Sequence, residues 1–236
     1  MVYAWATEHS PSIPLSRGWS IFAINATTGT EIWQTIGSMS PTIVSDGYLT
    51  AGNVYDGYVY CFGMGLSATT VSAPQTAITA GTNVTISGTV LDQSPAQPGT
   101  ACVSDASMGD WMAYLHQQAT CPANVTGVPV SIDAIDPNGN PVHIATVTSD
   151  ALGGFGCAWT PTTPGLYKIT TTFAGTDSYS YSSADARATV NQAPTATSTT
   201  QPTQAATDYT MTIIGTGIAV ILAVAIVGVL MLRKRP

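Results

Sequence analysis

A run of twenty residues without a charged side chain, which starts at Ile213 and ends at Leu232, constrains this chain more than any other feature. A helix rises about 1.5 Å per residue, so a run of this length spans about 30 Å, the thickness of a bilayer's hydrocarbon core. The run is apolar on every face, which favours a lipid-exposed helix over a helix buried in a protein core. We therefore predict a transmembrane helix within residues 209–232.

Three basic residues, Arg233, Lys234 and Arg235, follow this run directly and make up half of the six Lys and Arg in the chain. Basic residues beside a spanning helix stay on the cytoplasmic side of the membrane. We therefore predict a cytoplasmic tail at 233–236 and a single-pass protein of the cell membrane. The bulk of the chain is then extracellular.

The segment before the span supports this orientation. Residues 193–208 are rich in Thr and Pro and contain no large apolar side chain, which predicts an extended stalk. Three Asn-x-Thr sequons, at Asn25, Asn83 and Asn124, are candidates for N-glycosylation. The four cysteines are an even number, as expected where disulfides form.

The charge balance excludes nucleic acid as a partner. The 236 residues contain 6 Lys and Arg against 13 Asp and Glu, so the formal net charge is −7. A surface of this sign repels phosphate groups. The predicted partners are the lipid bilayer, through the C-terminal helix, and a surface protein or glycan as ligand. The sequence leaves the oligomeric state open.

Residues 1–66 contain short strands separated by glycine turns. Strands are expected at 20–25 and 30–34, on either side of a Thr-Gly turn, and at 58–62 after Asp-Gly. The segments IFAINATTGTEIWQ and DGYVYCFG resemble the repeats of PQQ-like, quinoprotein-type β-propellers. The segment EHSPSIPLSRGW resembles an insertion of archaeal surface proteins of that class.

The resemblance implies incomplete propeller blades. A blade uses roughly 40–50 residues and a propeller needs 4–8 blades, so residues 1–66 supply about one and a half. The first residues also lack the basic start and apolar core of a signal peptide. We therefore expect the sequence to be the C-terminal part of a longer protein. A quinone cofactor would need a closed ring, so no cofactor is predicted for this chain.

Residues 67–192 predict an Ig-like β-sandwich. Apolar residues alternate along about seven segments with turns between them, for example Val84, Ile86 and Val90, then Val130 and Ile132. The segment PGLYKITTTFAGTDSYSYSSA resembles the end of Ig-like modules in microbial surface proteins. The residues 136–140, DPNGN, favour a hairpin turn over a calcium loop, because no Glu stands at the twelfth position.

An insertion at 94–126 interrupts the predicted sandwich. It contains Met108, Trp111, Met112 and Leu115 at helical spacing, in a helix expected over 107–118 with Ser107 and Asp110 as a capping box. This apolar stripe either packs on the sandwich or forms a partner-binding surface. Cysteines flank the helix, and we predict a disulfide between Cys102 and Cys121. Cys61 and Cys157 are interpreted as buried thiols, with their pairing left open.

The sequence predicts no catalysis in this chain. His9, His116 and His143 lack the paired spacing of metal ligands, and no nucleophile elbow is present. The predicted class is all-β: partial propeller blades, an Ig-like sandwich with a short inserted helix, then one transmembrane helix. The expected function is binding, adhesive or structural, at the cell surface. The alternative is the membrane-anchor end of a quinoprotein-like dehydrogenase whose propeller active site lies upstream.

Overall fold

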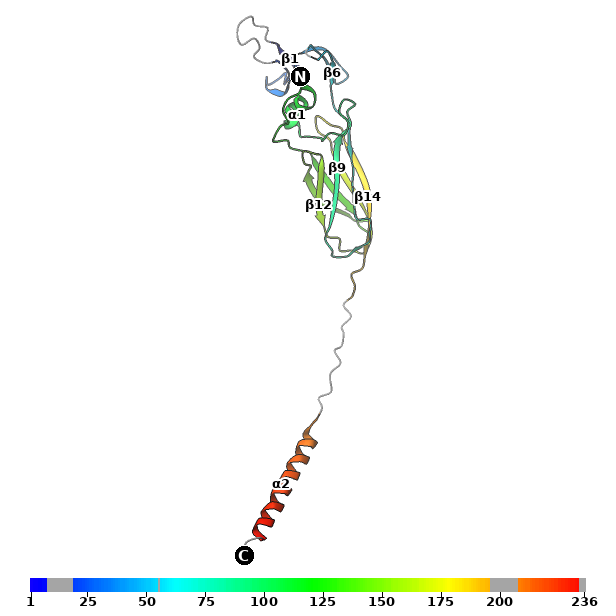
Figure 1. The fold of residues 1–236 in the computed structure, drawn as a ribbon. Coiled ribbons are helices and arrows are strands. Elements are labelled where there is room, and N and C mark those ends of the chain that lie inside the picture. Colours follow the sequence, from blue (N-terminus) through cyan, green and yellow to red (C-terminus); the bar gives the residue numbers. More distant parts are fainter. Residues whose placement is uncertain (8–18, 55, 196–207, 234–236) are drawn as a thin grey trace, which may run out of the picture. The chain divides into compact units, whose positions relative to one another are not determined.

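The computed structural model describes residues 1–7, 19–54, 56–195 and 208–233. These residues form two compact units, Met1–Ala193 and Pro194–Pro236. Figure 1 shows strands throughout the first unit and one helix in the second. Most of the predicted stalk lies outside the described residues, as do Lys234, Arg235 and most of the segment that resembles an archaeal insertion.

The first unit begins with two antiparallel sheets of three strands each. The first sheet has the order β1 (Val2–Thr7), β2 (Trp19–Ile24) and β3 (Glu31–Ile36). The second has the order β4 (Met39–Ser45), β5 (Tyr48–Asn53) and β6 (Val59–Phe62). The predicted turn between β2 and β3 is present, and the Asn25 side-chain oxygen accepts bonds from the backbone N–H groups of Thr27 and Thr28.

The two N-terminal sheets share a small core. Its buried members are Ile21, Met39, Leu49 and Ala51. Aromatic side chains pack around it, and the Trp33 and Phe62 rings stack with centroids 5.6 Å apart. A propeller blade has four strands, whereas each of these sheets has three. The described residues therefore show two small β-meanders and do not show a propeller.

Residues 67–191 form two further sheets that face each other. The larger has the order β11 (Pro141–Thr148), β10 (Pro129–Ile135), β13 (Gly165–Phe173), β14 (Ser182–Asn191) and β8 (Ile78–Thr79). The smaller has the order β12 (Gly154–Trp159), β9 (Val84–Asp92) and β7 (Ser67–Thr69). Pairing is antiparallel except between β14 and β8. This is the predicted Ig-like β-sandwich type of fold.

The sandwich core follows from the alternation seen in the sequence. Ile86 and Val90 of β9, and Ile132 of β10, are fully buried on the inward faces. Phe173 at the end of β13 is also fully buried, and the Trp159 and Tyr167 rings meet edge to face at 5.0 Å. Facing rows of β-branched and aromatic residues give one continuous apolar layer between the sheets.

The helix α1 (Asp105–Gln117) begins two residues earlier than predicted. Ser104 is its N-cap, and Ser107 lies inside the helix instead of capping it. The Ser107 hydroxyl accepts a hydrogen bond from the backbone N–H of Thr126 at 3.1 Å. The predicted capping box is therefore wrong. Ser107 does not cap the helix, and its hydroxyl bonds to the backbone of Thr126, which is distant in the sequence.

The apolar stripe of α1 packs inside the unit, which is the first of the two alternatives above. Trp111 is buried beside Ala101 and Val103, and Met108 contacts both this cluster and the sandwich core. The other side of α1 lies against β3, where a Cβ on Gly109 would approach the Gln34 carbonyl oxygen to 2.4 Å. The helix is thus held between the sandwich and an N-terminal sheet.

Polar contacts strengthen this junction at the end of α1. The Asn53 side-chain amide donates to Gln117 Oε1 at 3.1 Å. The Tyr60 hydroxyl lies 3.1 Å from the His116 carbonyl oxygen and 2.7 Å from Asp56 Oδ2. Burial, with the Asp56 carboxylate as a further cause, raises the pKa of Tyr60, so this hydroxyl stays a neutral donor. The second small sheet is therefore fastened to α1.

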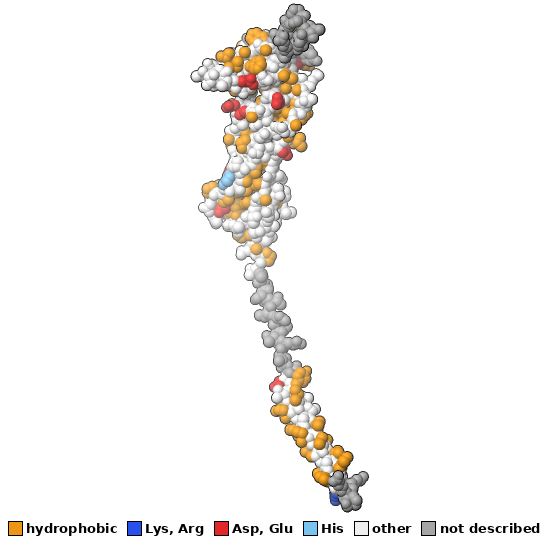
Figure 2. Space-filling view, turned by 90° about the vertical axis from the view of Figure 1, so that its left-hand side faces the viewer, with side chains coloured by type: hydrophobic (Ala, Val, Ile, Leu, Met, Phe, Trp, Pro, Cys, Tyr) orange, Lys and Arg blue, Asp and Glu red, His pale blue; other side chains and the backbone are white. Residues whose placement is uncertain are grey.

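The second unit contains α2 (Thr210–Arg233), a helix of 24 residues with no buried residue. A stretch of 18 residues within it has a mean hydropathy of 2.8. Figure 2 shows hydrophobic side chains along its surface. The predicted anchor residues Ile213 and Leu232 lie within it, and Arg233 ends it. The predicted apolar helix is confirmed as one candidate transmembrane helix.

Candidate functional site

The outward face of the larger sandwich sheet carries four charged side chains: Asp133, Lys168, Asp185 and Arg187. Strand register places His143, Asp133, Thr170 and Asp185 in one row across β11, β10, β13 and β14. The next row contains Ile135, Lys168 and Arg187. The opposite sheet differs, because its strands contain one charged residue, Asp92 at the end of β9. We call the charged surface of β10, β11, β13 and β14 the polar face.

One end of the polar face is a hydrogen-bonded cluster around Asp133. His143 Nδ1 lies 2.7 Å from Asp133 Oδ1, and the Ser131 hydroxyl donates to Asp133 Oδ2 at 2.7 Å. Thr146 Oγ1 lies 3.3 Å from His143 Nε2. This connectivity resembles that of an acid–base–nucleophile triad. The His143 side chain is 57% exposed, however, so water screens the pair, and the cluster mainly joins β10 to β11.

A second cluster lies on β13 and β14. Lys168 Nζ is 2.9 Å from Asp185 Oδ2, and the Thr170 hydroxyl donates to Asp185 Oδ1 at 2.6 Å. The Thr170 hydrogen bond, and then Lys168, lower the pKa of the Asp185 carboxyl. The Asp185 carboxyl is therefore ionised at neutral pH, and Lys168 balances its negative charge.

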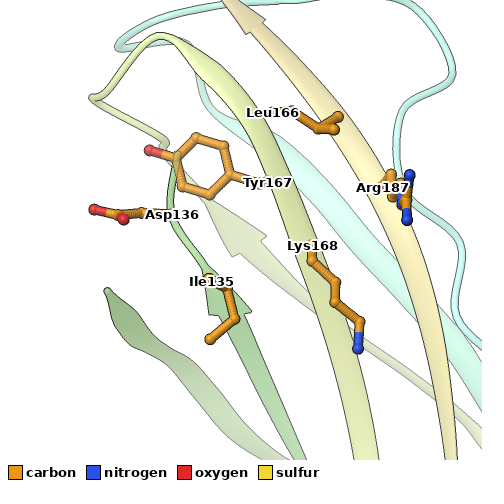
Figure 3. A pocket seen from close by; sticks show the side chains of 6 residues that line it. All are labelled: Ile135, Asp136, Leu166, Tyr167, Lys168 and Arg187. Atoms are coloured by element: carbon orange, nitrogen blue, oxygen red, sulfur yellow. The ribbon is translucent and has the colours of Figure 1, made fainter. Parts of the chain in front are cut away.

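A shallow groove of about 200 Å³ lies at the end of the polar face, next to the turn between β10 and β11. Six residues line it: Ile135, Asp136, Leu166, Tyr167, Lys168 and Arg187. Figure 3 shows Asp136 and Ile135 on one side of β13, and Arg187 on the neighbouring strand. We call this hollow the β13–β14 groove. It combines apolar, anionic and cationic groups in a small space.

The turn at 136–140 has the hairpin form that the sequence favoured. Asp136 Oδ1 accepts bonds of 2.8 Å from the backbone N–H groups of Asn138 and Asn140. Bonds from Asn140, more than those from Asn138, lower the pKa of the Asp136 carboxyl. Gly139 takes the left-handed conformation, with φ of 86°. The Asp136 carboxylate thus holds the turn, and Asp136 also lines the groove.

The predicted disulfide between Cys102 and Cys121 is not formed, and all four cysteines are free thiols. Cys102 is fully buried in the sandwich core, whereas Cys121 is exposed in the segment after α1. Cys157 is half-buried, and Cys61, interpreted as buried, is instead exposed. Burial raises the pKa of the Cys102 thiol to about 12.

This difference predicts the order of thiol reactivity. Alkylation requires the thiolate, so Cys102 should stay unmodified at pH 8 while exposed Cys121 is labelled. Native full-length protein would be treated with iodoacetamide and mapped by mass spectrometry. Denatured protein is the control and should be labelled at both positions. Equal labelling in the native protein, or a crosslinked Cys102–Cys121 peptide before reduction, would contradict the prediction.

The three candidate glycosylation sites differ in accessibility. Asn83 and Asn124 are exposed, whereas Asn25 is half-buried and its side-chain oxygen holds the β2–β3 turn. Attachment of a glycan at these asparagines stays a prediction. Within the described part of the chain, no three His, Cys, Asp or Glu side chains group as metal ligands.

Sequence reasoning missed the polar face and the β13–β14 groove. Asp133 and His143 are ten positions apart in the sequence and meet only because a bulge shifts the register between Ile132 and Asp133. Lys168 and Arg187 are brought together by the regular antiparallel pairing of β13 with β14. The available signal was weak: two of the few basic residues lie in adjacent predicted strands.

No protein-family model and no curated protein matches the chain. Among solved structures, it is similar to a CARDB domain from Pyrococcus furiosus in complex with di-metal ions. The TM-score is 0.31 and the identity 13%, over 55% of this chain and 91% of that one. The chain is also similar to Salmonella alpha-2-macroglobulin reacted with methylamine. Here the TM-score is 0.32 and the sequence identity 14%, over 75% of this chain and 11% of that one. These likenesses are distant, and the fold rests on the strand order itself.

Proposed function

We propose that this chain is a single-pass cell-surface protein that presents its β-sandwich outside the membrane in a binding or adhesive role. The observation that carries the proposal is α2, a mostly apolar helix of 24 residues with no buried side chain, because such a surface needs a nonpolar surrounding. The basic residues Arg233, Lys234 and Arg235 support a cytoplasmic C-terminus.

Binding fits the polar face better than catalysis does. The face is open, and its best-defined acid–base pair, Asp133 with His143, is about half exposed to water. Exposed side chains of mixed chemistry on a rigid sheet can contact a partner without enclosing a reaction. The proposed partner is a surface protein or a glycan.

We further propose that the two N-terminal sheets are parts of propeller blades. Their antiparallel meanders support this, as do the apolar residues on their outer surfaces. Ile43 is 63%, Tyr58 68% and Val59 74% exposed. Blades cover such surfaces by packing against neighbouring blades. The sequence resemblance to PQQ-like repeats points the same way.

The topology can be tested in intact cells that express the full chain with one tag at each end. The chain should sediment with membranes, and added protease should remove the N-terminal tag and spare the C-terminal tag. A chain ending at Asp208, which lacks α2, is the control and should leave the membrane fraction. Membrane release of the full chain, or digestion of only the C-terminal tag, would refute the proposal.

A further inference from the structure

Two cations stand opposite each other at the β13–β14 groove. Lys168 and Arg187 are the only Lys and Arg among the described residues that precede α2, and they are register partners. Like charges directly opposite on a sheet repel each other. Asp185 compensates Lys168 at 2.9 Å. In the part of the chain that the structure describes, no carboxylate forms an ion pair with the exposed Arg187.

The groove beside Arg187 has an apolar wall and an anionic wall. Ile135 is 42% and Leu166 52% exposed, so both present apolar surface beside the charged groups. Asp136 lies on the other side of β13 from Arg187, and its carboxylate accepts hydrogen bonds from backbone N–H groups of the turn. A second carboxylate would be repelled there, whereas a hydroxyl group could donate a hydrogen bond to Asp136.

The walls of the groove are fixed in place. Tyr167 is buried, its ring packs on Trp159, and its hydroxyl accepts a bond from the Thr163 backbone N–H at 3.3 Å. Gly165 has φ of 135°, and a Cβ there would approach Pro137 to 2.5 Å. The turn that carries Asp136 is therefore packed directly on the start of β13. A ligand would meet a largely preformed site.

We propose that the β13–β14 groove binds a carboxylated sugar, a uronic acid residue of a glycan. The carboxylate pairs with the Arg187 guanidinium, whose planar fork suits a carboxylate. The apolar face of the ring contacts Ile135 and Leu166, and a ring hydroxyl donates to Asp136. A volume of about 200 Å³ suits one sugar ring. This inference rests on the proposed binding role and names its ligand chemistry.

The test uses the full chain in detergent micelles, titrated with glucuronate at low salt and followed by calorimetry or ligand-observed NMR. Glucose tests the ring without the carboxylate, and acetate tests the carboxylate without the ring. We expect glucuronate to bind at least about tenfold more tightly than either. Arg187→Gln should weaken glucuronate binding by about tenfold or more. Ser183→Gln, exposed on the same strand, is the matched control and should not change it.

Three outcomes would contradict the proposed site. Equal binding of glucuronate and glucose, equal binding of glucuronate and acetate, or full affinity in Arg187→Gln would overturn the inference. Unchanged circular dichroism of Arg187→Gln shows that lost binding is not lost folding. The topology experiment is independent: a reversed orientation with intact glucuronate binding refutes the proposed function and leaves this site standing.

Discussion

Residues 1–66, expressed alone, are expected to show no cooperative unfolding transition. Among the described residues of this segment, the shared core cluster is small, with Ile21, Met39, Leu49 and Ala51 as its buried members. Segments of this size seldom supply enough buried surface to fold unaided. In the full chain β3 packs on α1, and Asn53 and Tyr60 bond to the end of that helix. The isolated segment loses all of these contacts.

The measurement is circular dichroism during heating, with residues 67–193 as the control. The control segment retains the larger core between the sandwich sheets and should unfold in one cooperative step. A sigmoidal transition in the 1–66 segment would show that the N-terminal sheets form an independent domain. It would also remove one reason to regard them as parts of a larger propeller.

Replacement of Phe173 by alanine is expected to lower the free energy of unfolding of the sandwich by about 3–5 kcal/mol. The side chain is fully buried at the end of β13, in the core between both sheets. Deleting the ring removes apolar contacts and leaves a cavity that the β-strands can only partly close. Domains of this size have only about 5–15 kcal/mol of stability, so the loss is a large share.

Urea unfolding of the full chain in detergent would measure this change. Tyr181→Ala is the matched control, because it removes an aromatic ring that is 60% exposed. The control should change the unfolding free energy by no more than about 0.5 kcal/mol. Similar unfolding midpoints for the two variants would mean that Phe173 does not lie in the core as described.

Features encoded by neighbouring residues were predictable from the sequence. The apolar run of α2 is local, and its length and composition alone specify a helix long and apolar enough to cross a membrane. The alternation of β9, β10 and β13 specified which side chains face inward. The turn at 136–140 followed from Asn-Gly chemistry. Each of these needs no knowledge of distant residues.

Features that depend on two distant segments were not predictable. The first residue of α1 and the role of Ser107 were predicted wrongly, because Thr126 decides where that hydroxyl bonds. The predicted disulfide failed because the core takes up Cys102, and core membership depends on how both sheets pack.

A β-rich chain with one apolar C-terminal helix and a sandwich of alternating strands can be inferred from the residue pattern alone. The meeting of Lys168 with Arg187, and of Asp133 with His143, depends instead on how strands pair in the folded chain. Pairing of this kind depends on strand register. Side chains alternate along a strand with a period of two, so a shift of one residue moves each of them to the other face of the sheet. The register is set by bulges and by packing between segments that are distant in the sequence. A single stretch of sequence therefore does not determine it.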